Sequence, residues 1–165
     1  MSPEEFDELY RASAPRLVGQ VHAMCGDVAE AQDVVQEAFE RAWQHRSRLD
    51  RERSPEAWVR VTAMRLAVSR WRRQRNAVLA WRRRAHDLVD APGEPFDPVL
   101  VAALLALPEA QRLAIVLHHL ADLSVEAVAA ELAVPVGTVK ARLSRGRRAL
   151  AAALAAPTVK EGRHV

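Results

Sequence analysis

Residues 123–150 read LSVEAVAAELAVPVGTVKARLSRGRRAL, and this stretch decides the fold of the C-terminal half. Ser124 is a favourable N-cap for a short helix that reaches Leu132. A second, basic helix is expected from Val136 to about Leu154, after a connection of a few residues. A short capped helix, a tight turn and a longer basic helix form the layout of a helix-turn-helix.

The second of these helices has two contrasting faces. Because successive helical residues rotate by about 100°, Val139, Leu143, Gly146 and Leu150 share one stripe that faces the core. The opposite side carries small and basic side chains. An α-helix fits the major groove of DNA, where arginine and lysine bind guanine edges and small residues permit close approach. The candidate DNA-reading residues are Thr138, Lys140, Ala141, Ser144, Arg145 and Arg148. A surface helix with solvated arginines is the alternative.

Charge is distributed in blocks along the 165 residues. Residues 1–45 carry 9 acidic and 3 basic side chains, and residues 46–84 carry 3 and 13. Residues 85–109 carry 5 acidic side chains and no basic one, whereas residues 110–165 carry 4 and 8. Two basic zones separated by acidic ones indicate two surfaces that face nucleic acid and at least one surface for another partner.

The N-terminal half is predicted to be helical over residues 5–23 and 29–45, and again from Ser54. Pro15 interrupts the first helix and marks a kink or a boundary between two short helices. Residues 46–54 are charged and have no helical period, which predicts a loop.

Residues 85–98, AHDLVDAPGEPFDP, contain three prolines and four acids but no base. This composition is typical of an extended tether. The sequence therefore predicts an all-α protein of two small helical domains joined by a flexible acidic linker, the C-terminal one a helix-turn-helix. The predicted boundaries are 1–76 for the first domain, 77–98 for the linker, 99–154 for the second domain and 155–165 for a tail.

Two further motifs lie in the first domain. Residues 33–43, DVVQEAFERAW, place Asp33, Gln36, Glu37 and Glu40 on one polar helix face. Nothing in folding requires these side chains, and a solvated surface would also explain them. Residues 54–75 interleave arginines with Trp58 and Trp71, a combination that suits single-stranded nucleic acid because bases stack on aromatic rings. We expect Trp58 to be at least partly in the core.

Catalytic, metal and membrane functions find little support. The sequence has no glycine-rich phosphate loop, paired catalytic carboxylates or nucleophile elbow, so we expect neither an enzyme nor a cofactor. His22 and Cys25 have ligand-like spacing, but completing a metal site would need His118 and His119 from the other domain, and we predict no metal. One cysteine, no secretion signal and no apolar run long enough for a bilayer indicate a cytoplasmic protein without membrane insertion.

Three segments together resemble one protein family: DVVQEAFERAW, SPEAWVRVTAMRLAVSRWRR and LPEAQRLAIVLHHLADLSVEAVAAELAVPVGTVKARLSRGRRAL. They are similar, in the same order, to the extracytoplasmic-function (ECF) sigma factors, over about residues 5–75 and 99–151. The resemblance implies a first domain that docks on core RNA polymerase and melts the −10 promoter element. It implies a second domain that reads the −35 element.

The resemblance also implies residue roles. Contact with the clamp helices of the largest polymerase subunit falls to Asp33, Gln36, Glu37 and Glu40, and the flap region is a second polymerase contact. Contact with −10 DNA, including capture of a flipped base by the loop after residue 45, falls to Arg46, Arg48, Arg51, Arg53, Trp58, Arg65, Arg72 and Arg73. The −35 contacts are the helix residues named above, from Thr138 to Arg148. An anti-sigma factor is implied as a partner, although no residue identifies one.

Three sites depart from the family pattern. His118 and His119 stand where arginine and tyrosine are frequent, so one expected phosphate contact is weaker. Arg65 stands where asparagine is usual, which puts −10 contacts there in question. Ala133 replaces a frequent glycine in the turn, at a cost of up to about 1 kcal/mol if the backbone there has a positive φ. Two other classes of protein compete with a sigma factor. A dimeric helix-turn-helix regulator that binds duplex DNA without polymerase leaves the acidic face and the second basic zone without a role. A pure interaction protein leaves the basic helix face unexplained.

Overall fold

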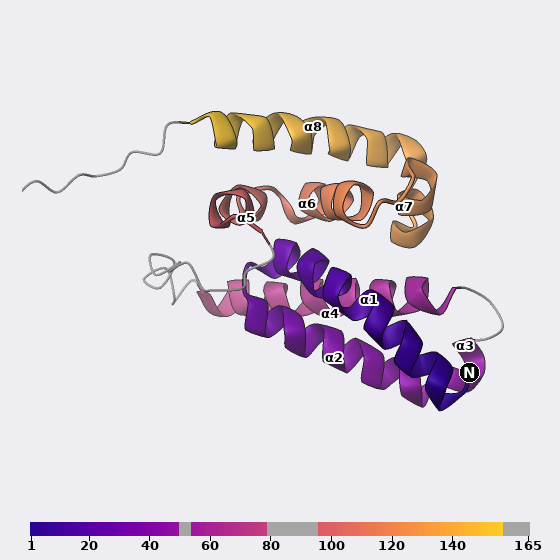
Figure 1. Cartoon of the computed structure of the whole chain (residues 1–165). Coiled ribbons are helices and arrows are strands. Elements are labelled where there is room, and N and C mark those ends of the chain that lie inside the picture. Colours follow the sequence, from indigo (N-terminus) through magenta and orange to yellow (C-terminus); the bar gives the residue numbers. More distant parts are fainter. Residues whose placement is uncertain (50–53, 79–95, 157–165) are drawn as a thin grey trace, which may run out of the picture.

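The computed structural model describes residues 1–49, 54–78 and 96–156, and within these ranges the only regular secondary structure is helical (Figure 1). The prediction of an all-α fold is therefore confirmed. The N-terminal unit (residues 1–78) contains α1 (Pro3–Cys25), α2 (Val28–Gln44), α3 (Arg46–Leu49) and α4 (Pro55–Val78). The C-terminal unit (residues 96–156) contains α5 (Pro98–Leu105), α6 (Glu109–Ile115), η1 (Val116–Leu120), α7 (Val125–Leu132) and α8 (Val136–Ala155).

The first two helices begin at side-chain caps. The Ser2 hydroxyl accepts a hydrogen bond from the Glu5 amide, and the Glu5 carboxylate accepts one from the Ser2 amide, which forms a capping box. Gly26 ends α1 in the left-handed conformation with φ +78°. The next residue, Asp27, caps α2 by accepting from the Glu30 amide at 3.0 Å. The hairpin between the two helices is therefore determined by local residues.

Pro15 does not divide the first helix, so the second of the two predicted alternatives, a boundary between two short helices, is wrong. The helix α1 continues from Pro3 to Cys25 with Pro15 on its exposed side. Leu17 and Val21 of the following turns are buried in the core. We attribute the continuity to this burial, which outweighs the hydrogen bond that proline cannot donate.

The loop predicted after α2 is also partly wrong. Residues 46–49 form the short helix α3, and Leu49 at its end is buried. We attribute the helix to the burial of Leu49 in the core, which stabilises it although the other residues of the segment are polar or charged. Arg51 and Arg53, both predicted to contact DNA, lie outside the described residues, as does most of the predicted linker.

The helix-turn-helix forms as predicted. The Ser124 hydroxyl accepts from the Ala127 amide at 3.1 Å, and α7 ends at Leu132. The apolar stripe of α8 is buried, with Val139 and Leu143 in the core and Leu150 packed against it. The helix predicted from residue 109 to 120 is present, but its last turn widens into the π-helix η1.

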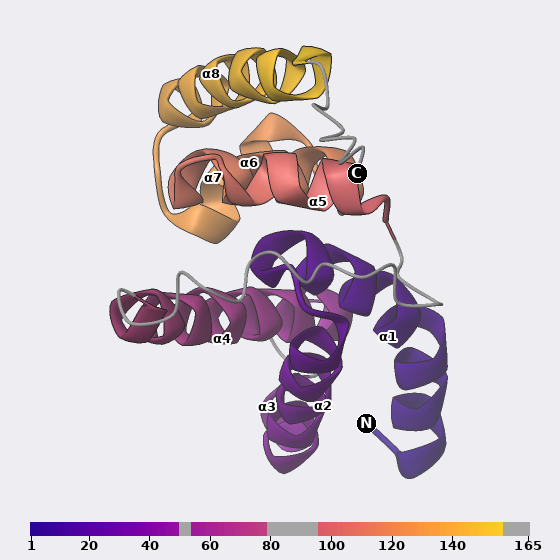
Figure 2. The same cartoon turned by 90° about the vertical axis from the view of Figure 1, so that its left-hand side faces the viewer.

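The two units pack directly on each other (Figures 1 and 2). Helices α5, α6 and α7 form a layer over α1 and α4, and α8 lies on the far side of that layer. Leu105 of α5 sits so close to Gly26 that a Cβ atom there would lie 2.5 Å from the leucine Cδ1. The rings of His22 and Phe96 stack beside this contact with centroids 6.4 Å apart. Buried residues of both units therefore form one continuous core.

Candidate polymerase and nucleic-acid interfaces

The polar face of α2 borders a shallow depression of about 550 Å³, which also reaches Arg70 of α4. Asp33, Gln36 and Glu40 are exposed, and the Gln36 amide donates to the Glu40 carboxylate at 3.0 Å. On the opposite side of α2, Val35 and Phe39 are buried as predicted. The structure thus gathers all four predicted docking residues on one surface.

Glu37 differs from its three neighbours because it is held within the fold. Arg70 of α4 donates to its carboxylate and also to Glu30 at 3.1 Å, and Arg41 donates to it at 2.5 Å. These hydrogen bonds, that of Arg70 above all, lower the pKa of the Glu37 carboxyl. The expectation that folding makes no use of this side chain is therefore wrong, since Glu37 ties α2 to α4.

A second hollow lies where α2, α3 and the start of α4 meet. It measures about 440 Å³ and is lined by His45, Arg48, Leu49, Trp58, Val61, Thr62 and Arg65. Trp58 is partly buried against the core, as predicted, and its ring lies 5.9 Å from that of His45. Arg46 lies nearby, with its guanidinium 4.3 Å from the centre of the Trp43 ring. Aromatic rings bordered by arginines offer a base both stacking and phosphate contacts.

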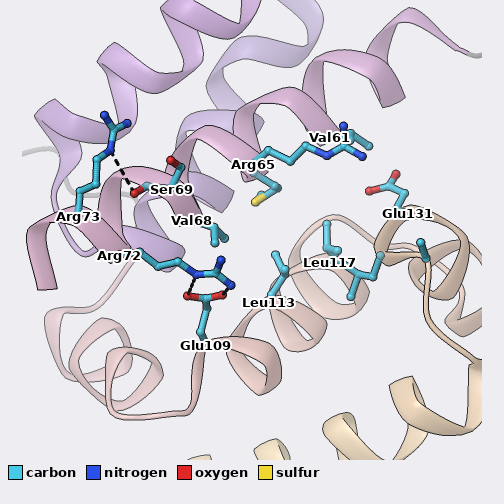
Figure 3. Close-up of a pocket in the computed structure, with 13 residues that line it drawn as sticks. Val61, Arg65, Val68, Ser69, Arg72, Arg73, Glu109, Leu113, Leu117 and Glu131 are labelled. Atoms are coloured by element: carbon cyan, nitrogen blue, oxygen red, sulfur yellow. Dashed lines mark hydrogen bonds and ion pairs between the residues drawn. The ribbon is translucent and has the colours of Figure 1, made fainter. Parts of the chain in front are cut away.

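The rest of the predicted −10 set lies elsewhere. Arg72 and Arg73, together with Arg65, line a different cavity of about 520 Å³ between α4 and the C-terminal unit (Figure 3). Arg72 forks onto the Glu109 carboxylate of α6, with Nε and Nη2 at 2.9 and 2.6 Å from its two oxygens. Helix α4 therefore contributes predicted −10 residues to two separate cavities, and Arg65 is the one of these residues that borders both.

The predicted −35 residues lie along α8 on the side away from its buried stripe. Lys140, Ser144, Arg145 and Arg148 are exposed, and Thr138 and Ala141 are half-buried. The turn before this helix depends on Ala133, which adopts the left-handed conformation at φ 54°. The backbone at residue 133 therefore has the positive φ that a glycine would favour, although this chain has alanine there.

Several charged residues of structural importance were not singled out from the sequence. Arg60 of α4 donates to Glu131 of α7 through Nε at 3.1 Å and Nη2 at 2.5 Å. Arg112 is fully buried, and its guanidinium lies 4.4 Å from the centre of the Trp71 ring. The sequence offered no signal for these pairs, because Glu109 and Glu131 are separated from their arginine partners by 37 and 71 residues.

Metal binding and membrane insertion gain no support from the described residues. No three histidine, cysteine, aspartate or glutamate side chains among them gather into a metal site. Burial raises the pKa of the Cys25 thiol to about 11, which leaves it protonated and a poor ligand at neutral pH. Within the same ranges, none of the helices has both the length and the apolar character that crossing a bilayer requires.

Comparison with known proteins defines the class. Residues 9–77 match the family model described as Sigma-70 region 2, and residues 99–150 match the model described as Sigma-70, region 4. These two regions in this order define an RNA polymerase sigma factor, a transcription initiation factor. They do not favour a conventional helix-turn-helix regulator.

Individual relatives narrow the class to a family. The ECF RNA polymerase sigma factor SigW of Bacillus subtilis is 34% identical over 145 residues, which cover 78% of each chain. SigL of Mycobacterium tuberculosis, also an ECF sigma factor, is 33% identical over 149 residues, covering 86% of this chain and 84% of the relative. The chain belongs to the ECF sigma factor family.

Solved structures agree on the fold. The sigma factor RpoE in complex with the anti-sigma factor NepR from Bartonella quintana superposes with a TM-score of 0.74 at 24% identity, covering 92% of this chain and 97% of that one. CnrH in complex with the cytosolic domain of CnrY gives a TM-score of 0.72, also at 24% identity, covering 93% and 89%.

Proposed function

We propose that this sigma factor docks on core RNA polymerase through the exposed acids of α2, binds the −10 element through α3 and α4, and reads the −35 element with α8. Its role in directing promoter-specific initiation follows from its two sigma regions. The residue assignment is supported by one observation: three surfaces of different chemistry lie in different parts of the structure. They are the acidic face of α2, the aromatic hollow beside α3, and the basic outer face of α8.

We place the −10 function in residues 1–76 and the −35 function in residues 99–154, with 77–98 as linker and 155–165 as tail. The acids of α2 suit the basic surface of the clamp helices in the largest polymerase subunit, and the C-terminal unit suits the flap region. In this role the chain is a non-catalytic subunit that acts in the cytoplasm, where the polymerase works. We also assign it an anti-sigma factor as a partner, by analogy with the two solved complexes.

Charge reversal on α2 tests the docking assignment. Asp33→Lys with Glu40→Lys leaves the Glu37–Arg70 tie intact, so thermal stability should change little, because surface substitutions usually cost within about 0.5 kcal/mol. Polymerase binding should collapse, because like charges placed against each other at an interface cost several kcal/mol. Asp7→Lys with Glu8→Lys, two exposed acids of α1, is the matched control and should bind polymerase normally.

The readout is transcription by core polymerase on genomic fragments from the source organism, with start sites mapped for each variant. Wild-type and control chains should produce a common set of start sites that share −10 and −35 sequences. A double α2 variant with wild-type promoter-specific transcription would place the polymerase contact elsewhere. Absence of specific start sites with the wild-type chain would overturn the function itself.

A further inference from the structure

The cavity between α4 and the C-terminal unit has the size and composition of a small-molecule site (Figure 3). Its volume is about 520 Å³, and ligand pockets in proteins usually measure roughly 300–1,000 Å³. Such pockets combine a mostly apolar wall with a few polar groups. Here the apolar wall is formed by side chains of both units, which are Val61, Met64, Val68, Leu113, Leu117 and Leu132.

The apolar wall retains surface that a ligand could cover. Met64 and Leu117 are buried, whereas Val61, Val68 and Leu113 are only half-buried. Figure 3 shows Val68 of α4 and Leu113 of α6 pointing toward each other across the cavity. An apolar group placed between them would remove the remaining apolar surface from water, which is favourable.

The charges around the cavity do not balance. Three arginines and two glutamates line it. Both glutamates are already paired, one with Arg72 and the other with Arg60, which lies outside the lining. The remaining two arginines, Arg65 and Arg73, form no ion pair with a carboxylate in the part of the chain that the structure describes. The cavity therefore has an excess of positive charge, which favours an anionic ligand.

The arrangement of these groups indicates the kind of anion. In Figure 3, Arg65 extends along the cavity toward Glu131, whereas Arg72 is held by Glu109 at the other end. The apolar side chains lie between the two ends. The planar guanidinium of arginine binds a carboxylate through two parallel hydrogen bonds. A molecule with one carboxylate head and an apolar tail therefore matches both the charge of Arg65 and the wall beside it.

We propose that this cavity binds an amphipathic carboxylate, whose head pairs with Arg65 and whose tail packs between Val68 and Leu113. Arg73 adds a second positive charge at the rim. Binding itself is independent of the proposed function. One consequence rests on that function: Arg65 and Arg73 are among the residues that we assign to −10 DNA, so the carboxylate and a DNA strand would compete for them.

The test uses decanoate as the probe and the full-length chain as its receptor. Calorimetric titration, at decanoate concentrations too low for micelles, should show saturable one-to-one binding. Decyltrimethylammonium has the same tail and a cationic head, so it should not bind. Absence of saturable decanoate binding would overturn the proposal. Equal binding of the two probes would also overturn it, because the site would then recognise the tail alone.

A pair of double variants tests the role of the two arginines. Arg65→Gln with Arg73→Gln should weaken decanoate binding by at least about tenfold, because hydrogen bonds between charged groups are among the strong ones. The matched control is Arg11→Gln with Arg147→Gln, which removes the same charge from exposed positions that do not line the cavity. The control should bind decanoate like the wild-type chain. An equal loss in both variants would reduce the effect to net charge and overturn the proposed site.

Methyl-group NMR of the wild-type chain locates the bound tail without any variant. Decanoate should shift the methyl resonances of Val68, Leu113 and Leu117 most, because these side chains line the cavity. The largest shifts at Val99 or Leu154, which are exposed large aliphatic side chains, would instead reveal binding to the outer surface and overturn the proposal. Neither measurement uses DNA or polymerase. A negative result would therefore remove the ligand site and leave the proposed sigma function unaffected.

Discussion

Ala133 carries the only backbone strain that the sequence allowed us to anticipate. The residue ends α7 at φ 54° and ψ 45°, a conformation in which the alanine Cβ crowds its own carbonyl. Ala133→Gly should therefore raise the free energy of unfolding by about 0.5–1 kcal/mol, measured by urea denaturation. Ala130→Gly, on an exposed helical position one turn earlier, should instead lower it by about 1 kcal/mol. Equal effects at the two positions would show that the turn is not strained.

Glu37 shows how far residue-scale prediction from sequence can go. Helical spacing placed it correctly beside Asp33 and Glu40. The same spacing could not reveal that Arg70, 33 residues later, would use its carboxylate to join two helices. A periodic pattern identifies the face of a helix, whereas the partner of one side chain on that face depends on packing between helices.

At the scale of elements, caps and apolar periods predicted most helices well, and the exceptions have a common cause. Pro15 and the charged residues of α3 both oppose helix formation locally. In each case a buried leucine nearby, Leu17 or Leu49, favours the helix through contacts with other elements. Side-chain caps determined where the capped helices begin. In segments whose residues disfavour a helix, burial of an apolar side chain determined that a helix forms.

The crossing of α6 and α8 depends on a glycine that helical spacing placed on the core-facing stripe, although the sequence could not show which residues it meets. Gly146 is buried, and a Cβ atom there would lie 2.7 Å from Ile115 Cδ1 and 3.4 Å from Gln111 Cβ. Gly146→Ala should lower the free energy of unfolding by about 1 kcal/mol, because overpacking costs ~1–3 kcal/mol and the gain in helix propensity offsets only about 1. Gly137→Ala in the same helix meets no atom within 4 Å and should stabilise the protein. Thermal melts of the two variants should therefore move in opposite directions.

For the whole molecule, the charge blocks indicated separate basic surfaces, but they did not reveal which acids contact the basic helix α4. Most of the acidic stretch at residues 85–98 lies outside the described residues. In the described structure, Glu109 and Glu131 of the C-terminal unit contact the basic helix α4. Composition averages over a block, so it cannot single out two acids that meet arginines across an interface.

Helix α8 lies on the far side of the α5–α7 layer from α4, so its outer face is exposed for contact with the −35 element in the holoenzyme. Arg145 and Arg147 are both exposed on α8, but they lie on opposite flanks of buried Gly146, about 100° to either side of it. The predicted DNA-reading face includes Arg145 and excludes Arg147, whose charge, after burial and His118, helps to lower the pKa of His119 in η1. Arg145→Ala should therefore cost about 1–3 kcal/mol of discrimination between an intact and a substituted −35 element, while Arg147→Ala should keep it. The measurement is the ratio of transcripts from two such promoters in one reaction with core polymerase. If both variants retained the wild-type ratio, α8 would contact the promoter through another face. If Arg147→Ala alone lost it, the recognition surface would lie on the flank nearer His119.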